Sequence, residues 1–283
     1  MEIINYIITR NRHVLKAIKN QRKRPTVQIK AVITDINGTI DSAIYGKALD
    51  MVHIKKIRSL IEQSKHDNAI PKIILNTGWD LNYTLLYAQL LNDLHYHIIE
   101  RGAAIVSIDG PFVHEQVDPR INDQILQQIA QLQAGFIKKY PQFYRSYQVG
   151  KKYMLSFQFE IGSENKQDCL EKLQQYIREN NMDYEIEEGS NFINVGVKGI
   201  NKGSGAEMLI ATEPELTFDN VVGIGDSDGD WAYIKKCAIK ACPSNASRFL
   251  RENCDYIASK PETEGVIEIL EQIIQWNLEL GLK

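Results

Sequence analysis

The chain has 283 residues, of which 43% are hydrophobic and 24% charged, and its formal net charge is -3. This length allows one large domain or two moderate ones, and the composition is typical of a globular protein. A dedicated nucleic-acid-binding protein would carry a strong basic excess, so the charge argues against a nucleic-acid partner. No apolar run approaches the roughly 20 residues that a membrane-spanning helix needs, so we expect no transmembrane segment.

The cysteines and the start of the chain indicate the cellular compartment. The four cysteines follow no CxxC spacing, and a disulfide framework is not expected in a chain of this length. The first residues are too polar and their apolar run is too short for a signal peptide. We therefore expect a cytoplasmic protein with free thiols.

The N-terminal segment differs in composition from the rest of the chain. The first thirty residues contain eight Lys or Arg residues and a single acid, Glu2, with isoleucines near helical spacing. We predict a basic N-terminal extension over residues 1–29. Two interpretations stay open: an amphipathic arm that contacts an anionic membrane, RNA or a partner, or a helix packed on the main domain.

From residue 27 the pattern alternates between strands and helices. Strands are expected at 27–34, 71–77 and 97–100, and helices at 48–65 and 81–93. Helices of this length between strands imply βαβ units and a parallel sheet.

Residues 108–197 do not follow the βαβ pattern of the preceding segment. Helices are expected at 121–133 and 167–180, and strands at 152–160, 184–187 and 192–195. The apolar–polar alternation of 152–160 is typical of a half-exposed strand in an antiparallel sheet. We predict an inserted α+β domain here.

The βαβ rhythm resumes near residue 198. Helices are expected after Lys202 and at 230–236 and 264–280, and strands at 220–224, 239–241 and 256–258. We therefore predict an α/β fold in which residues 30–107 and 198–283 form one parallel-sheet domain.

Residues suited to phosphoryl transfer follow these strands. Ligands bind beyond the carboxyl ends of the strands of an open parallel sheet, and Asp35, Thr77 and Asp226 each stand at or just past such an end. Asp35 is the candidate nucleophile, since a carboxylate can attack phosphorus. With Asp226 and Asp230 it would supply the hard oxygen ligands that Mg²⁺ prefers.

The remaining groups suit a phosphate. Thr77 offers a hydroxyl and a backbone N–H to phosphoryl oxygens, and Lys202 would neutralise charge that develops on the transferring group. Gly38 allows a sharp turn whose N–H groups can approach an anion.

In this order the motifs resemble those of the haloacid dehalogenase superfamily. That family carries Asp-x-Asp-Gly-Thr, then a Thr or Ser after an apolar strand, then a Lys, then Gly-Asp-Ser-x-Asn-Asp. Residues 35–39, Thr77, Lys202 and 225–230 match them in turn. The segment Glu100-Arg101-Gly102-Ala103 is similar to a further family pattern, and the resemblance covers residues 30–272.

The resemblance implies a fold and an activity. It implies a Rossmannoid core with an α/β cap at 108–197, as in the Cof-like branch that includes many sugar-phosphate phosphatases. The reaction would be Mg²⁺-dependent hydrolysis of a small phosphorylated metabolite through an aspartyl-phosphate on Asp35. The implied substrate-binding residues are Thr39, Thr77, Gly78 and Lys202, and the implied metal ligands are Asp35, Asn37, Asp226 and Asp230.

Position 37 departs from the family pattern. The family's second Asp protonates the leaving group and then activates the hydrolytic water, whereas Asn37 has no titratable proton near neutral pH. General acid–base help contributes about 10²–10⁴-fold in rate. The backbone carbonyl of Asn37 could still bind Mg²⁺.

Three explanations for Asn37 stay open. The chain is an active phosphatase that uses another acid such as Asp41 or a substrate with a good leaving group, or a catalytically silent protein that binds a phosphorylated metabolite. Alternatively, Asn37 is a substitution made to trap a complex.

Two further positions depart from the pattern, and the cap offers candidates for specificity. Trp79 stands where Arg is frequent and Gly229 where Asn is common. The candidate specificity residues in the cap are Tyr144, Arg145, Lys151, Lys152, Tyr153 and Asn191.

Overall fold

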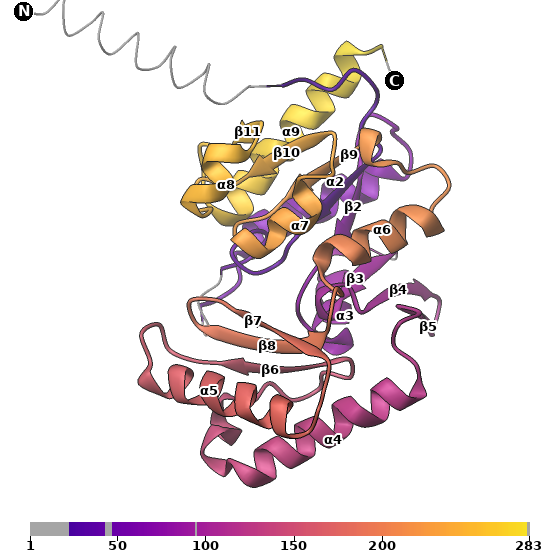
Figure 1. The fold of residues 1–283 in the computed structure, drawn as a ribbon. Coiled ribbons are helices and arrows are strands. Elements are labelled where there is room, and N and C mark those ends of the chain that lie inside the picture. Colours follow the sequence, from indigo (N-terminus) through magenta and orange to yellow (C-terminus); the bar gives the residue numbers. More distant parts are fainter. Residues whose placement is uncertain (1–22, 43–46, 94, 282–283) are drawn as a thin grey trace, which may run out of the picture.

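The computed structural model describes residues 23–42, 47–93 and 95–281. Its centre is a five-stranded parallel sheet with strand order β11-β10-β9-β1-β2 (Figure 1). The strands are β1 (Ala31–Thr34), β2 (Lys72–Leu75), β9 (Val221–Ile224), β10 (Ile239–Cys242) and β11 (Tyr256–Ile257). This sheet confirms the predicted α/β class. The isoleucine pattern of the N-terminal extension lies in residues 1–22, outside the described residues.

Helices cover both faces of the parallel sheet (Figure 1). One face carries α2 (Met51–Ser64), α3 (Leu81–Leu91) and α9 (Glu262–Glu279), and the other carries α6 (Lys202–Thr212), α7 (Trp231–Ile234) and α8 (Arg248–Asn253). Successive side chains of a strand point to opposite faces. Val32 therefore packs against the first set of helices, and Ala31 and Ile33 pack against the second. Because both faces are buried, the strands read as continuous apolar runs.

A second α+β unit lies between β5 (Phe112–Val117) and α6, and we call residues 123–197 the inserted unit. Its antiparallel sheet has the order β6-β8-β7, from β6 (Met154–Gln158), β7 (Tyr184–Glu188) and β8 (Phe192–Val197). Two helices, α4 (Asp123–Lys139) and α5 (Glu164–Glu179), and the short η2 (Pro141–Ser146) complete it. The helices bury one face of the sheet, which includes Leu155 and Phe157. The alternate side chains of β6, such as Ser156, point to the opposite face of this sheet.

A small antiparallel sheet joins the two parts and corrects one expectation. The strand predicted at 97–100, observed as β3 (His97–Ile99), pairs with β4 (Ala104–Asp109), which pairs with β5 (Phe112–Val117). A single parallel bridge, Asn76–Ile98, links β3 to the end of β2. The β4–β5 hairpin is absent from the sequence prediction because most of β5 is exposed and lacks an apolar pattern. The short helix α8 is absent from that prediction too.

The domain division remains a proposal. The predicted boundary at residue 107 falls inside β4, and a strand paired along its whole length with β5 is not a linker. We propose to place the boundary after β5 instead.

Two other expectations can be compared with the structure. All four cysteines are free and buried, as predicted. Among the helices of the described residues, none combines the length and apolar character that crossing a bilayer requires.

Candidate active site

Three carboxylates meet at the carboxyl edge of the parallel sheet. Asp35 follows β1, and Asp226 and Asp230 follow β9, which pairs with β1 so that Thr34 lies opposite Ile224. One oxygen atom from each of the three carboxylates lies within 4.8 Å of the others. The pairing of these two strands brings together residues that are about 190 positions apart in the chain.

Asp230 organises the loop that carries Asp226. Its Oδ2 accepts hydrogen bonds from the backbone N–H of Asp226 at 3.1 Å, from the N–H of Ser227 at 2.9 Å and from the Ser227 hydroxyl at 2.8 Å. The bond from the Ser227 N–H is one half of a capping box at the start of η4 (Asp228–Asp230); in the other half the Ser227 side chain accepts from the Asp230 N–H. Gly229 needs no Asn-like side chain to hold this loop, because Asp230 does so.

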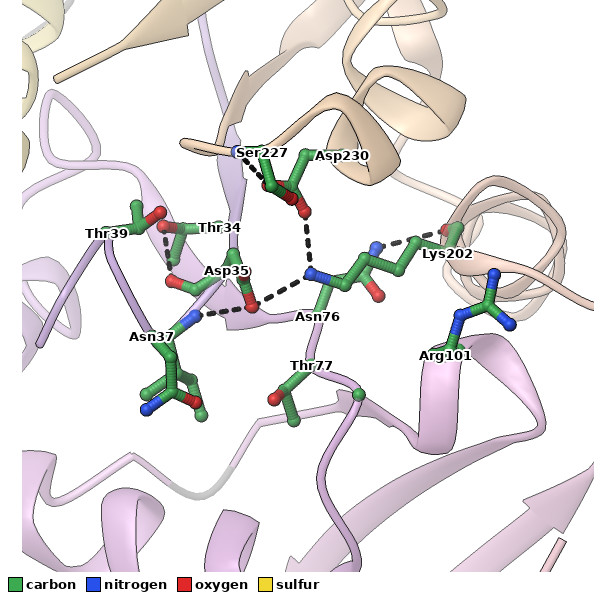
Figure 2. A network of polar contacts seen from close by, with 12 residues as sticks. Thr34, Asp35, Asn37, Thr39, Asn76, Thr77, Arg101, Lys202, Ser227 and Asp230 are labelled. Carbon is green, nitrogen blue, oxygen red and sulfur yellow. Dashed lines mark hydrogen bonds and ion pairs between the residues drawn. The ribbon is translucent and has the colours of Figure 1, made fainter. Parts of the chain in front are cut away.

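Lys202 lies between two of the carboxylates (Figure 2). Its Nζ is 2.9 Å from Oδ1 of Asp35 and 2.6 Å from Oδ1 of Asp230. Lys202 is the first residue of α6, whose start is fixed by a capping box between Asn201 and Ser204. The Asn76 amide donates to the Lys202 carbonyl at 3.1 Å, which ties this helix to the end of β2.

Burial and mutual repulsion shape the electrostatics of the cluster. Burial, and then the charges of Asp230 and Asp35, raise the pKa of Asp226 to about 8. Burial raises the pKa of Asp35 to about 6 against the opposing charge of Lys202. Burial also opposes the charge on Lys202, but Asp230 and Asp35 outweigh it and raise the pKa of that amine. Two buried acids, Asp35 and Asp230, and the half-buried Asp226 therefore share one cation.

This donor set fits a divalent cation. Mg²⁺ prefers carboxylate oxygens, and a bound cation removes the repulsion that raises the acid pKa values. Asp35 and Asp226 line the cavity described below. In Asp230, Oδ1 accepts from Lys202 and Oδ2 accepts from the backbone of the loop. Asp230 would therefore contact a cation through a water molecule, or through an oxygen that also keeps its present hydrogen bond.

The turn after Asp35 depends on glycine. Gly38 has a φ of 82°, in the left-handed region, and a Cβ there would come within 2.3 Å of Asp226 Oδ2. The Gly38 carbonyl accepts from the Asn245 amide at 2.8 Å. The turn thus packs closely against the second acidic loop, which a side chain at position 38 would prevent.

The implied substrate-binding residues divide into two groups. Thr77, Gly78 and Lys202 line the cavity together with Asp35. Thr39 is fully buried and donates to Asp226 Oδ1 at 3.0 Å. The geometry of Thr39 suits the positioning of Asp226, and its assignment to substrate binding stays a prediction.

The side chain of Asn37 is held by two aromatic residues. Its Oδ1 accepts from Trp79 Nε1 at 2.5 Å, and its Nδ2 donates to the Tyr83 hydroxyl at 2.8 Å. The Trp79 and Tyr83 rings stack with centroids 4.5 Å apart. The two sequence departures, at positions 37 and 79, are therefore in direct contact: an amide needs a donor for its oxygen, and the indole N–H supplies it.

The cavity beside these residues has a volume of about 370 Å³ and lies between the parallel-sheet part and the inserted unit. From the candidate list in the cap, Lys151 and Asn191 line it. The inserted sheet also presents Ser156, Gln158 and Asn194, with Glu187. Sequence reasoning missed these residues, although the alternation along β6 and β8 signals them: apolar neighbours face the helices, so the polar residues must face the cavity.

Comparisons with known proteins agree with this geometry. The family model for haloacid dehalogenase-like hydrolases matches residues 138–270. The phosphoglycolate phosphatase of Methanobrevibacter smithii is 34% identical over 82 residues, which are 29% of this chain and 35% of that relative's own length. A second phosphoglycolate phosphatase, from Methanosarcina acetivorans, is 23% identical over 248 residues, covering 87% of this chain and 96% of the relative.

The fold also has close structural neighbours. A haloacid dehalogenase-like hydrolase from Bacteroides thetaiotaomicron superposes with a TM-score of 0.65 at 15% identity, covering 87% of this chain and all of that one (100%). A structural likeness at this identity shows the fold alone. The similarity in sequence comes from the family model and the relatives. Residues 138–270 are thus similar in sequence to haloacid dehalogenase-like hydrolases, and the chain shares the fold of such a hydrolase.

Proposed function

We propose that the protein is a Mg²⁺-dependent phosphatase that hydrolyses a small phosphate monoester through an aspartyl-phosphate on Asp35. The observation that carries the proposal is the acidic cluster with Lys202 inserted into it, beside a cavity that Asp35, Asp226 and Thr77 line. The names of the relatives point to phosphoglycolate-like substrates, and the motifs of the Cof-like branch point to phosphosugars.

Asp35 is oriented to attack phosphorus. Within the described residues, its contacts fall on Oδ1, which accepts from the Ile36 N–H at 2.7 Å and pairs with Lys202. The other oxygen, Oδ2, is the one that would bond to phosphorus as the bond to the leaving alcohol breaks. A water molecule would then attack the acyl phosphate, which releases inorganic phosphate and restores the carboxylate.

The neighbouring groups would bind and stabilise the phosphate. The Thr77 hydroxyl and the Gly78 N–H would hold phosphoryl oxygens. The Thr77 N–H, expected from the sequence to do so, instead donates to the Ile98 carbonyl at 2.9 Å. The Lys202 charge would offset negative charge that grows in the transition state. Asp35 and Asp226, with Asp230 nearby and the Asn37 backbone carbonyl, would hold Mg²⁺. When bound, this cation would neutralise phosphate charge so that an anionic nucleophile can approach.

Asn37 limits the proton transfers of this reaction. The leaving alkoxide needs a proton and the attacking water must lose one. A side-chain amide can neither give up nor take up a proton near neutral pH. The locked amide therefore supports a second candidate function, a phosphometabolite-binding protein with little or no turnover.

Phosphate release separates the two functions. With Mg²⁺ and p-nitrophenyl phosphate or 2-phosphoglycolate, the wild type should release phosphate and Asp35→Asn should not, because the amide is no nucleophile. Asp168→Asn removes an exposed carboxylate on α5 and serves as the matched control. Equal release by the wild type and Asp35→Asn would reject the aspartyl-phosphate, and silence of the wild type with ligand binding would favour the binding protein.

Metal binding can be measured without turnover. Adding Mg²⁺ should raise the melting temperature of the wild type, because a ligand that binds only the folded state at 100 times its Kd stabilises it by about 2.7 kcal/mol. Asp226→Asn should lose most of this shift. Asp228→Asn, an exposed neighbour outside the acidic cluster, should keep it. The cluster is not the metal site if Asp226→Asn responds like the wild type.

A further inference from the structure

Four cationic residues line the cavity: Lys47, Arg101, Lys151 and Lys202. Lys202 belongs to the acidic cluster and Lys47 is exposed, which leaves Arg101 and Lys151. Arg101 belongs to η1 (Glu100–Gly102), directly after β3, and Lys151 precedes β6 in the inserted unit. One cation thus comes from each side of the cavity. Neither has a role in the reaction proposed above.

Lys151 carries a buried ammonium group. The residue is only 7% exposed, and its Nζ donates to the Gly78 carbonyl at 2.5 Å. The same nitrogen lies 5.3 Å from the centroid of the Trp79 ring. Within the described residues, no acid forms an ion pair with it. Burial lowers the pKa of Lys151 to about 8, although Glu100 and Asp80 act in the opposite direction. An ammonium has three donors, so a cavity ligand could accept from the others.

Arg101 is held in place by an acid of the inserted unit. Its Nε lies 2.7 Å from Oε2 of Glu187, and the Asn194 amide donates to the same oxygen at 3.0 Å. The residue is 9% exposed and has a φ of 60°, which is uncommon for a side chain of this size. Among the described residues, Glu187 is the one acid paired with it. A guanidinium offers five N–H donors in a planar fork that matches a carboxylate.

The two cations act on one another across the cavity. The charge of Arg101 is among the influences that lower the pKa of Lys151, so an anion between them would relieve repulsion as well as accept hydrogen bonds. The cavity volume of about 370 Å³ extends from Asp35 and Thr77 to these cations and to the polar side chains of β6 and β8. A phosphate at Asp35 therefore leaves room for a second anionic group at this end.

We propose that Arg101 and Lys151 form a second anion site, which selects phosphate monoesters whose alcohol carries a carboxylate. The inference rests on the proposed phosphatase function, since it concerns the leaving group of that reaction. The carboxylate accepts from the guanidinium fork and the ammonium while the phosphate lies against Thr77 and Lys202. The substrate class is a phosphorylated hydroxy acid.

Pairs of phosphate esters that differ only in the carboxylate test this assignment. 2-Phosphoglycolate is compared with 2-hydroxyethyl phosphate, and 6-phosphogluconate with sorbitol 6-phosphate, so each acid has a partner with CH₂OH in place of COO⁻. The wild type with Mg²⁺ should prefer the acid of at least one pair by about tenfold or more in kcat/KM, in line with charge-assisted hydrogen bonds. Lys151→Met and Arg101→Asn should bring that ratio close to one.

Lys152→Met is the matched control for Lys151→Met. Lys152 is adjacent in sequence, but its Nζ pairs with Glu115 at 3.0 Å and its side chain is 56% exposed, outside the residues that line the cavity. The control should keep the wild-type ratio. Using a ratio within each pair cancels any general loss of activity or of folded protein in a variant.

The outcomes separate this inference from the phosphatase itself. If no ester is hydrolysed, the dissociation constants of the same four compounds are measured with Mg²⁺ by calorimetry. A carboxylate preference in binding that Lys151→Met and Arg101→Asn remove would support the second anion site while rejecting the activity. The inference is overturned if neither acid is preferred, or if the preference survives in both variants.

Discussion

Replacing Asn37 by Asp should raise kcat for phosphate release by about 10²–10⁴-fold, the contribution typical of a general acid–base group. A carboxyl group at this position can protonate the leaving alcohol and then take a proton from the attacking water, which the amide cannot do. The measurement is steady-state phosphate release with Mg²⁺ from an alkyl phosphate, whose poor leaving group makes proton transfer matter most. p-Nitrophenyl phosphate should show a smaller gain because its leaving group needs little protonation.

The surroundings of position 37 can accept a carboxylate. Trp79 Nε1 already donates to the oxygen of the amide, and the Tyr83 hydroxyl, which accepts from Nδ2, can rotate to donate instead. We therefore expect the Asn37→Asp variant to remain folded.

A double variant and a second acid complete this experiment. Asn37→Asp combined with Asp35→Asn should be inactive, since the gain requires the nucleophile. A failure of Asn37→Asp to gain activity, in a protein whose turnover depends on Asp35, would mean that another group carries the proton. Asp41 is then the residue to replace, because it lines the cavity and accepts from the Tyr87 hydroxyl at 2.5 Å.

Removing the Lys202 amine should lower the free energy of unfolding by about 3–5 kcal/mol, the cost typical of breaking a buried ion pair from one side. The side chains involved are buried, with exposures of 11% for Lys202, 10% for Asp35 and 0% for Asp230. Lys202→Met leaves two buried carboxylates to repel each other and Asp226. Urea denaturation in EDTA measures the loss, and phosphate release should fall as well.

An exposed ion pair provides the comparison. Lys56 pairs with Glu271 at 2.6 Å, and the two side chains are 50% and 55% exposed. Lys56→Met should change stability by less than about 1 kcal/mol, because solvent screens such pairs. A similar effect of the two variants would show that Lys202 does not stabilise the acidic cluster. Adding Mg²⁺ should narrow the difference in stability between the wild type and Lys202→Met, because the cation replaces the missing positive charge. It should leave the difference between the wild type and Lys56→Met unchanged.

Much of the fold follows from local patterns in the sequence. Apolar runs such as 31–34 end at a carboxylate, and helical spacing follows them, so the parallel sheet and its helices could be predicted without coordinates. The positions of Asp35, Thr77 and Asp226 after strand ends also predicted a shared edge, because the strands of a parallel sheet all point the same way. The β4–β5 hairpin could not be predicted, since its second strand is exposed and stabilised by pairing with β4.

Several contacts of the site depend on residues that are distant in sequence. Nothing local indicates that Trp79 donates to Asn37, or that Glu187 of the inserted unit pairs with Arg101 of the sheet-bearing part. These pairings depend on how the loops and the inserted unit pack against the parallel sheet. The spacing of residues along the chain does not contain this information.

The sequence by itself determined the α/β class, the family resemblance and the main acidic and basic residues of the site, because these depend on periodicity and on short motifs. The alternation along β6 and β8 marks one polar face of the inserted sheet, but only the tertiary structure shows that this face lines the cavity. The tertiary structure also placed Lys151 inside and Lys152 outside, since adjacent residues leave the backbone in different directions and only packing selects between them.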